Sequence, residues 1–261
     1  MPNTSPSLAP QTAIAAFPAF EIVPGALSRG LILVADHARN ALPQAYGTLG
    51  LPQAELCRHI AYDIGVEGVL RALCGFLGVA GIFAGFSRLL IDPNRGIQDP
   101  TLIMQLSDGA VVPGNVGMGM AERQHRIDTY YTPYHRALSG LIDEAERLGV
   151  RPVLCSIHSF TPFWKGVARP WHAGVLWDGD DRFARPLMAA LEAEKDLVVG
   201  DNEPYAGGLA GDSMNAHGTQ RGLAHALIEI RQDLIADAAG QLAWAERLSR
   251  ILPHVLKEIA A

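Results

Sequence analysis

Apolar residues in this chain form short runs that alternate with longer segments of helical periodicity. The runs over residues 30–35, 153–158 and 226–231 are apolar at almost every position, which is typical of strands buried on both faces of a parallel sheet. Shorter apolar runs predict further strands over residues 78–83, 88–92, 173–177 and 197–199.

Between these runs, apolar residues recur at helical spacing. The segments that predict helices are 53–77, 121–148, 182–194 and 238–259. Pro133 is expected to kink the second of them. Strands that alternate with helices predict an α/β fold, a three-layer α/β/α sandwich with a mostly parallel mixed sheet.

The ends and the loops set the expected domain organisation. We interpret the Pro-rich residues 1–20 as an N-terminal extension and residues 21–261 as a single domain. Segments 96–120 and 201–222 are rich in glycine and polar residues and longer than usual connections. Loops of this kind often cover binding sites.

Composition narrows the class of protein. An apolar fraction of 49% with 18% charged residues is ordinary for a globular enzyme. The net charge of −6, without a cluster of Lys or Arg, argues against nucleic-acid binding. We see neither a secretory signal nor a membrane-spanning run, and the three cysteines have no paired spacing. We therefore expect a cytoplasmic protein that does not bind membranes, and the sequence leaves its oligomeric state open.

Two of the buried runs lead into histidines, His37 and His158. Polar groups at the carboxyl ends of parallel strands converge in one crevice, and imidazole is a common zinc ligand. A catalytic zinc ion takes three protein ligands and leaves one position to water. Asp63, among apolar neighbours, is the first candidate for the third ligand, with Asp36 and Asn40 as alternatives.

A third strand, over residues 226–231, carries one glutamate, Glu229, among apolar residues. A charged group is rarely buried without a partner. One interpretation is an ion pair with Arg231, two residues further along the strand. The other, which we favour, is a general base beside the metal.

A segment with two arginines suggests how a substrate is held. In an extended segment Arg88 and Asp92 face the same side, and Asn94 and Arg95 follow directly. Guanidinium groups bind carboxylates through paired hydrogen bonds, so these arginines suit an acidic substrate. A salt bridge that fixes the loop is the alternative; we expect one arginine for each task and favour Arg95 for the substrate.

Several segments, taken together and in order, resemble the N-formylglutamate amidohydrolase family. The similarity extends over about residues 22–234 and is carried by residues 36–43, 59–65, 87–95, 131–135, 158–160, 200–205 and 225–233. It implies a phosphorylase/hydrolase-like fold, shared with zinc carboxypeptidases, muramoyl-alanine amidases and aspartoacylases. It also implies cleavage of the amide of an acylated acidic amino acid.

The resemblance implies roles for individual positions. His37 and His158 take the places of two zinc histidines, and Asp63 that of a carboxylate ligand. Residues 92–95 resemble the carboxylate-binding Asp-Leu-Asn-Arg of aspartoacylases, and Glu229 falls at the catalytic glutamate. The chain departs from the carboxypeptidase pattern where His-x-x-Glu ends here in Asn40.

We therefore predict an amidohydrolase for an N-acylated acidic amino acid such as N-formylglutamate. It is expected to depend on one Zn²⁺ ion, with other divalent metals such as manganese or iron as alternatives. Its expected partner is a small acidic molecule. The predicted metal ligands are His37, Asp63 and His158, and the predicted catalytic residues are Glu229 and Arg95. The predicted substrate-binding residues are Arg88, Asn94, Arg95, Arg169, Asn202 and His217. The alternatives are a peptide or cell-wall amidase on the same fold and a non-catalytic protein that binds small carboxylates.

Overall fold

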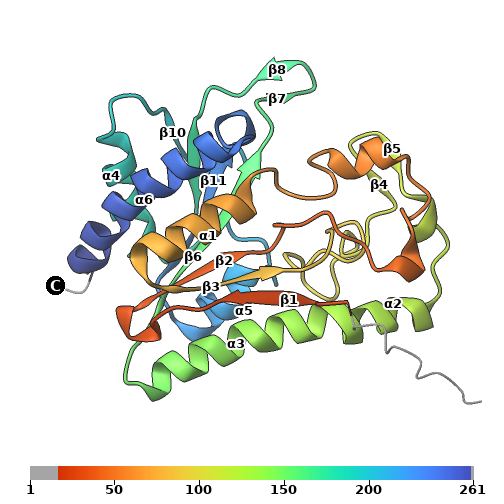
Figure 1. Ribbon diagram of the computed structural model, residues 1–261, viewed down its shortest axis with the longest axis horizontal. Helices are drawn as coiled ribbons and strands as arrows, with labels where there is room; N and C mark the ends of the chain where they lie inside the picture. The colour runs from red at the N-terminus through yellow and green to blue at the C-terminus, as the bar shows by residue number, and fades with distance from the viewer. Residues whose placement is uncertain (1–16, 260–261) are drawn as a thin grey trace, which may run out of the picture.

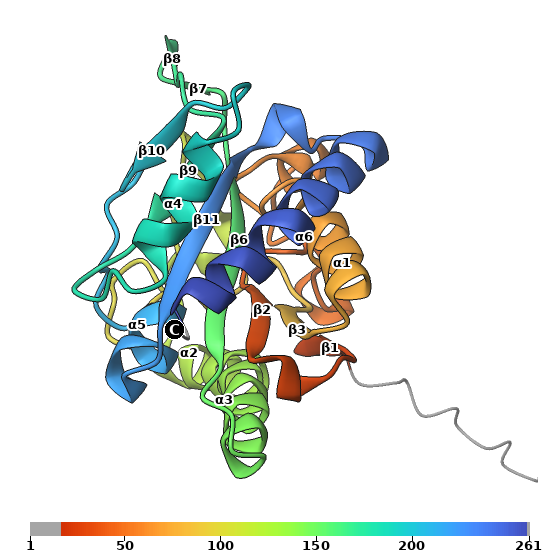
Figure 2. The same ribbon diagram turned by 90° about the vertical axis from the view of Figure 1, so that its left-hand side faces the viewer.

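The three most apolar runs form adjacent strands at the centre of a seven-stranded sheet (Figures 1 and 2). This computed structural model describes residues 17–259. Side by side, the strands are β1 (Phe20–Val23), β3 (Ala80–Ala84), β2 (Leu31–Ala35), β6 (Val153–Phe160), β11 (His225–Arg231), β9 (Ala173–Leu176) and β10 (Val199–Asp201). Strands β3, β2, β6 and β11 are parallel to one another, whereas β1 and β9 run antiparallel to their neighbours β3 and β11.

Helices cover both faces of the sheet, as the predicted three-layer fold requires. In β2, Leu31 and Leu33 pack into the core beneath one group of helices, while Ile32 and Val34 pack into the core on the opposite face. The first group is α1 (Val66–Leu77), α4 (Ala184–Glu192) and α6 (Ala238–Ile259). The opposite face carries α3 (Thr132–Arg147) and the short α5 (Ser213–His217). This alternation on the central strands confirms the α/β/α prediction.

The strand order predicts a ligand-binding crevice at the carboxyl ends of the central strands. From β2 the chain crosses outward to β3, and it then returns to the other side of β2 to form β6. Ligands of open α/β sheets bind where the strand order reverses in this way, beyond the carboxyl ends of the strands. The residues that follow β2 and those that end β6 therefore meet at this position.

The long helix predicted over residues 121–148 is confirmed, with its distortion where Pro133 was expected to kink it. It consists of α2 (Met120–Arg126), a π-helical stretch η5 (Ile127–Tyr131) and α3, which begins one residue before Pro133. Proline has no N–H to donate to the carbonyl four residues earlier, and the helix widens into a π turn just before it. Such turns are frequent at functional sites. Tyr131 and Tyr134, on either side of Pro133, are buried.

The prediction of one helix over residues 53–77 was wrong in its first half. Residues 53–57 form only a short 3₁₀ turn, and α1 begins at Val66. Gly65 stops the helix from extending backwards because its φ is +84°, and a Cβ there would lie 2.1 Å from the Ile235 carbonyl oxygen. Asp63 consequently lies in a loop before α1, where its carboxylate is not tied to the spacing of a helix.

The strand predicted over residues 88–92 is also absent, and the chain makes turns there. The backbone N–H of Leu90 donates to the Ser87 carbonyl, while the Ser87 hydroxyl donates to the Ala61 carbonyl. The apolar side chains of Leu89, Leu90 and Ile91 are buried all the same. The segment is apolar because its side chains are buried, although its residues belong to no strand of the sheet.

Two small hairpins lie outside the main sheet. Strands β4 (Leu106–Ser107) and β5 (Ala110–Val111) form one inside the loop 96–120, and β7 (Phe163–Trp164) and β8 (Val167–Ala168) form the other after β6. Along residues 17–259, none of the helices has a stretch long and apolar enough to cross a bilayer. Most of the predicted extension 1–20 lies outside the described residues, so the division into an extension and one domain stays a prediction.

Candidate metal centre and active site

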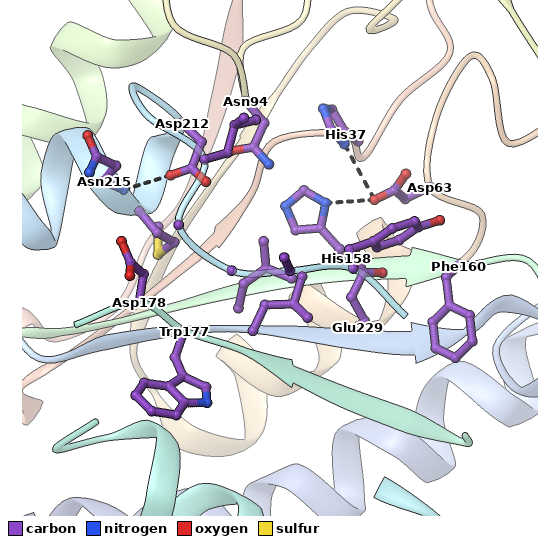
Figure 3. A pocket seen from close by; sticks show the side chains of 18 of the residues that line it. His37, Asp63, Asn94, His158, Phe160, Trp177, Asp178, Asp212, Asn215 and Glu229 are labelled. Atoms are coloured by element: carbon purple, nitrogen blue, oxygen red, sulfur yellow. Dashed lines mark hydrogen bonds and ion pairs between the residues drawn. The ribbon is translucent and has the colours of Figure 1, made fainter. Parts of the chain in front are cut away.

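The sheet brings His37 and His158 together at the predicted crevice. His37 follows β2, His158 lies in β6, and their ring centroids are 4.9 Å apart (Figure 3). Both side chains are almost completely buried. The two histidines that ended separate apolar runs in the sequence therefore share one cavity.

Asp63 completes a cluster with the two rings. Its backbone N–H donates to the His37 carbonyl (2.8 Å), which fixes the loop beside β2. Its Oδ2 lies 2.8 Å from Nδ1 of His158 and 3.5 Å from Nδ1 of His37. One ligand atom from each residue lies within 4.8 Å of the other two, so a single cation can contact all three.

The far side of each ring is held by another carboxylate. Nε2 of His37 donates to Asp92 (2.6 Å), and Nε2 of His158 donates to Asp36 (3.2 Å). These bonds leave both Nδ1 atoms facing the cluster, and Nδ1 of His37 is buried without a hydrogen-bond partner among residues 17–259. Carboxylates that orient the second ring nitrogen are the usual support of metal-binding histidines. Two imidazole nitrogens and a carboxylate suit zinc, so the residues present fit such an ion.

The charges around the cluster favour a cation. Burial by itself would raise the pKa of Asp63, but the His37 and His158 rings hold it well below its usual range. Burial also opposes a charge on His158, yet hydrogen bonds to Asp36 and Asp63 raise its pKa to about 10. A proton and a metal ion are attracted to this position by the same carboxylates.

The two alternative candidates for the third ligand lie elsewhere. Asp36 stands behind His158, where its carboxylate also accepts hydrogen bonds from Tyr134 (2.8 Å), Ser156 (3.2 Å) and Ser213. Asn40 donates to the Leu56 carbonyl (2.7 Å) and is not part of the cluster. Asp63 is therefore the member of the predicted set that the fold places with the two histidines.

Glu229 lies next to the cluster because β11 pairs with β6 in register. Its Cα partner across the two strands is His158, and the residue is 5% exposed. Its Oε2 has no hydrogen-bond partner in the part of the chain that the structure describes. Burial raises the pKa of Glu229 to about 7. The alternative ion pair is wrong, since Arg231 binds Asp233 instead (2.8 Å). A carboxylate with a raised pKa beside candidate metal ligands is suited to accept and return a proton.

A cavity of about 330 Å³ opens beside these residues. Seven of the predicted site residues line it: His37, Asp63, Arg88, Asn94, Arg95, His158 and Glu229. The segment from Tyr205 to Leu209 forms another part of its wall, and Trp177 and Asp178 lie across from Asn94 and Asp212 (Figure 3). The wall therefore includes part of the predicted loop 201–222 and no residue of 96–120.

The two arginines of the cavity differ in their partners. Arg88 binds Asp92 (2.9 Å) and lies 3.5 Å from Asp63, so its charge is balanced within the site. Arg95 donates to Thr101 (3.2 Å) and to the Asn94 carbonyl (2.9 Å), and within residues 17–259 it pairs with no carboxylate. Arg95 is the guanidinium left available for a ligand.

Three predicted substrate-binding residues do not line the cavity. Arg169 donates a hydrogen bond to the hydroxyl of Tyr205, which itself lines the cavity. Asn202 accepts hydrogen bonds from the backbone N–H groups of Trp177 and Gly207. His217 stacks on His135 beneath the loop that carries Asn94. The expectation of direct contact with a substrate in the cavity is therefore corrected for all three.

The structure also reveals supporting residues that the sequence analysis did not assign. Asp92 holds His37, and three side chains of the distorted helix contact the same region. Tyr131 donates to the Arg95 carbonyl (2.9 Å), Tyr134 donates to Asp36, and His135 binds the Pro93 carbonyl (3.0 Å). The sequence signals in this region were the dense run of aromatic residues around Pro133 and the family-like segments 87–95 and 131–135.

The chain is similar in sequence to a known protein family. The family model of N-formylglutamate amidohydrolases matches residues 29–236. Gene product Atu2144 from Agrobacterium tumefaciens is 34% identical, with 93% of this chain and 96% of that chain covered and a TM-score of 0.86.

A second solved structure is similar in fold. N-formylglutamate amidohydrolase from Ralstonia eutropha JMP134 is 21% identical, with 92% and 98% of the two chains covered and a TM-score of 0.70. Among curated proteins no significant match was found.

Proposed function

Because the chain belongs to the N-formylglutamate amidohydrolase family, we propose that it is a zinc-dependent hydrolase of N-acylated acidic amino acids. N-formylglutamate is the first candidate substrate. The observation that carries this proposal is the buried cluster of His37, Asp63 and His158, with Glu229 in register beside His158. A cavity of about 330 Å³ is suited to a small molecule, which favours this function over a cell-wall amidase.

The residues of the cluster define where the ion would be held. His37 and His158 would bind it through Nδ1, and Asp63 would bind it through a carboxylate oxygen. A bound zinc ion polarises a carbonyl group and lowers the pKa of water to about 7. Asp36 and Asp92 keep both rings in the required orientation, because each accepts the proton of the opposite ring nitrogen.

Glu229 would move the proton. Its free Oε2 accepts a proton from the attacking water, and the carboxyl group then gives that proton to the leaving amine nitrogen. The products are the free amino acid and the carboxylate of the acyl group, which is formate for a formyl substrate. Glu229 is unpaired at Oε2 and lies beside the metal cluster, which supports this role.

Arg95 would hold the carboxylate of the substrate, because it is the cavity arginine without an acidic partner among the described residues. Replacing Arg95 with alanine is expected to raise KM by about 10-fold or more, the effect of losing a charge-assisted hydrogen bond. Steady-state kinetics measure the change. Arg95→Lys is the matched control and should recover part of the loss; an unchanged KM in Arg95→Ala would assign the carboxylate to another residue.

The function is tested with a panel of N-formyl, N-acetyl and N-succinyl derivatives of glutamate, aspartate and alanine. We expect the highest kcat/KM with an acidic N-formyl amino acid, loss of activity with a chelator, and recovery on adding zinc. Product amine is measured directly. Binding of these compounds without turnover in the zinc-loaded protein would instead indicate the non-catalytic carboxylate-binding protein.

A further inference from the structure

Arg169 is a buried cation that has no acidic partner among the described residues. Its side chain is 9% exposed and donates to the carbonyl and hydroxyl oxygens of Thr161 (3.3 and 3.1 Å) and to the Tyr205 hydroxyl (3.2 Å). In the described part of the chain it forms no ion pair. The rings of Phe160, Trp164 and Tyr205 surround its guanidinium at 5.0–5.7 Å. A buried charge held in this way acts strongly on the groups next to it.

Tyr205 links Arg169 to the cavity. Its phenol oxygen accepts the hydrogen bond from Arg169, and its ring is one of the cavity walls. Within residues 17–259 the hydroxyl proton has no acceptor, so it is available to a ligand. A hydroxyl group that accepts a bond from a cation becomes a stronger donor, because hydrogen bonds in a chain polarise one another.

The backbone holds Tyr205 in place. We call residues 202–208 the strap. The side-chain oxygen of Asn202 accepts the N–H groups of Trp177 (2.9 Å) and Gly207 (3.0 Å). A Cβ on Gly207 would lie 2.2 Å from the Trp177 carbonyl oxygen, so the strap packs directly on this backbone. Asn202 and Gly207 thus fix the strap on both sides of Tyr205.

Tyr205 is separate from Arg95, the residue proposed to hold the carboxylate of the substrate. Arg169 stacks on Phe160, which lies on the opposite side of His158 from Asn94 (Figure 3). Arg95 follows Asn94 in the chain and donates a hydrogen bond to its carbonyl, so the Arg95 guanidinium is held beside Asn94. A substrate held by Arg95 and crossing the metal cluster would place its reacting acyl group toward Tyr205.

We propose that Tyr205 is a catalytic hydrogen-bond donor to the amide oxygen, which becomes negatively charged when water adds to the carbonyl carbon, and that Arg169 is its positioning residue. This inference rests on the proposed function. Tyr205 transfers no proton. The hydrogen bond from its hydroxyl to the amide oxygen becomes stronger as the negative charge on that oxygen grows. Donors aimed at a developing charge lower the barrier more than they strengthen binding of the substrate.

Tyr205→Phe tests the donor, because it keeps the ring against Arg169 and removes only the hydroxyl. We expect kcat to fall about 100-fold, as for the loss of one such donor elsewhere, with KM and zinc content nearly unchanged. A kcat within threefold of wild type would overturn the proposal. A raised KM with an unchanged kcat would overturn it too, since it would make Tyr205 a binding residue for the carboxylate.

Arg169→Gln and the double variant test the coupling. If Arg169 acts through the Tyr205 hydroxyl, kcat of the double variant should be no lower than kcat of Tyr205→Phe alone. Arg169→Lys should keep part of the kcat that Arg169→Gln loses. If the fold-losses in kcat of the two single variants multiply in the double variant, Arg169 is not the positioning residue of Tyr205. Tyr205→Phe still decides the role of the donor if the Arg169 variants do not fold.

A binding measurement gives a second readout that does not depend on turnover. A phosphinic analogue, with a tetrahedral anionic PO₂ group in place of the reacting amide, should bind Tyr205→Phe about 10-fold or more weakly than wild type. The free amino-acid product, held by Arg95, should bind both equally. Equal affinity for the analogue would contradict the donor role, whereas a wild-type protein that cleaves no amide in the panel would overturn the proposed function together with this inference.

Discussion

Replacing Glu229 with glutamine is expected to lower kcat by about 100-fold or more while zinc content stays at the wild-type level. Glutamine has nearly the same shape but cannot accept a proton from water at neutral pH. Glu229 is outside the set of ligand atoms, so metal binding should survive. Steady-state kinetics and metal analysis of the same preparation provide both measurements. A variant that keeps wild-type turnover would remove Glu229 from the proposed mechanism.

The pH profile gives this prediction a second readout. A general base works only when ionised, so kcat/KM should fall as the pH drops through the pKa of Glu229. Burial raises that pKa to about 7, and a neighbouring cation favours the ionised form and lowers it. The acidic limb should therefore lie below pH 7. Glu229→Gln should show the residual rate without this limb; persistence of the same limb would assign it to another group.

Removal of a ring from the cluster is expected to abolish tight metal binding. His37→Ala leaves one imidazole and one carboxylate, and we expect metal affinity to fall at least 100-fold, with activity falling in parallel. Asp92→Asn keeps the ring but loses the charge that orients it, so its affinity should fall about 10- to 100-fold. Zinc titration against a competing chelator measures both.

His59→Ala is the matched control for this prediction. His59 also lines the cavity, but it lies outside the cluster and 3.4 Å from Asp108. Its replacement should leave zinc affinity unchanged. If His37→Ala binds zinc as tightly as wild type while His59→Ala does not, the metal site belongs to a different part of the cavity.

The central strands and the meeting of the two histidines could be predicted because both follow from burial. A strand covered on both faces must be apolar throughout, and parallel order brings the ends of β2 and β6 to one edge. The choice among Asp36, Asp63 and Asn40 could not be made in the same way. It depends on the loop that Gly65 produces before α1, and that loop was interpreted as helix.

Residues in loops and at the end of the short helix α5 were harder to place for a physical reason. The direction of Arg169, Asn202 and His217 is set by tertiary contacts, and no periodic pattern records them. Arg169 turns toward Tyr205, Asn202 toward the backbone of Gly207, and His217 toward His135. The apolar run at residues 89–91 misled for a related reason, since burial in a turn selects the same side chains as burial in a strand.

The three side chains that could hold a metal ion, His37, Asp63 and His158, come from distant parts of the chain. Such a set cannot persist in the denatured ensemble, so the ion should have affinity for the native state alone. Thermodynamic linkage then makes the ion a stabiliser, with a gain of about 2.7 kcal/mol when free zinc exceeds Kd 100-fold. Under the proposed zinc dependence, the melting temperature of the protein would therefore rise with the concentration of free zinc.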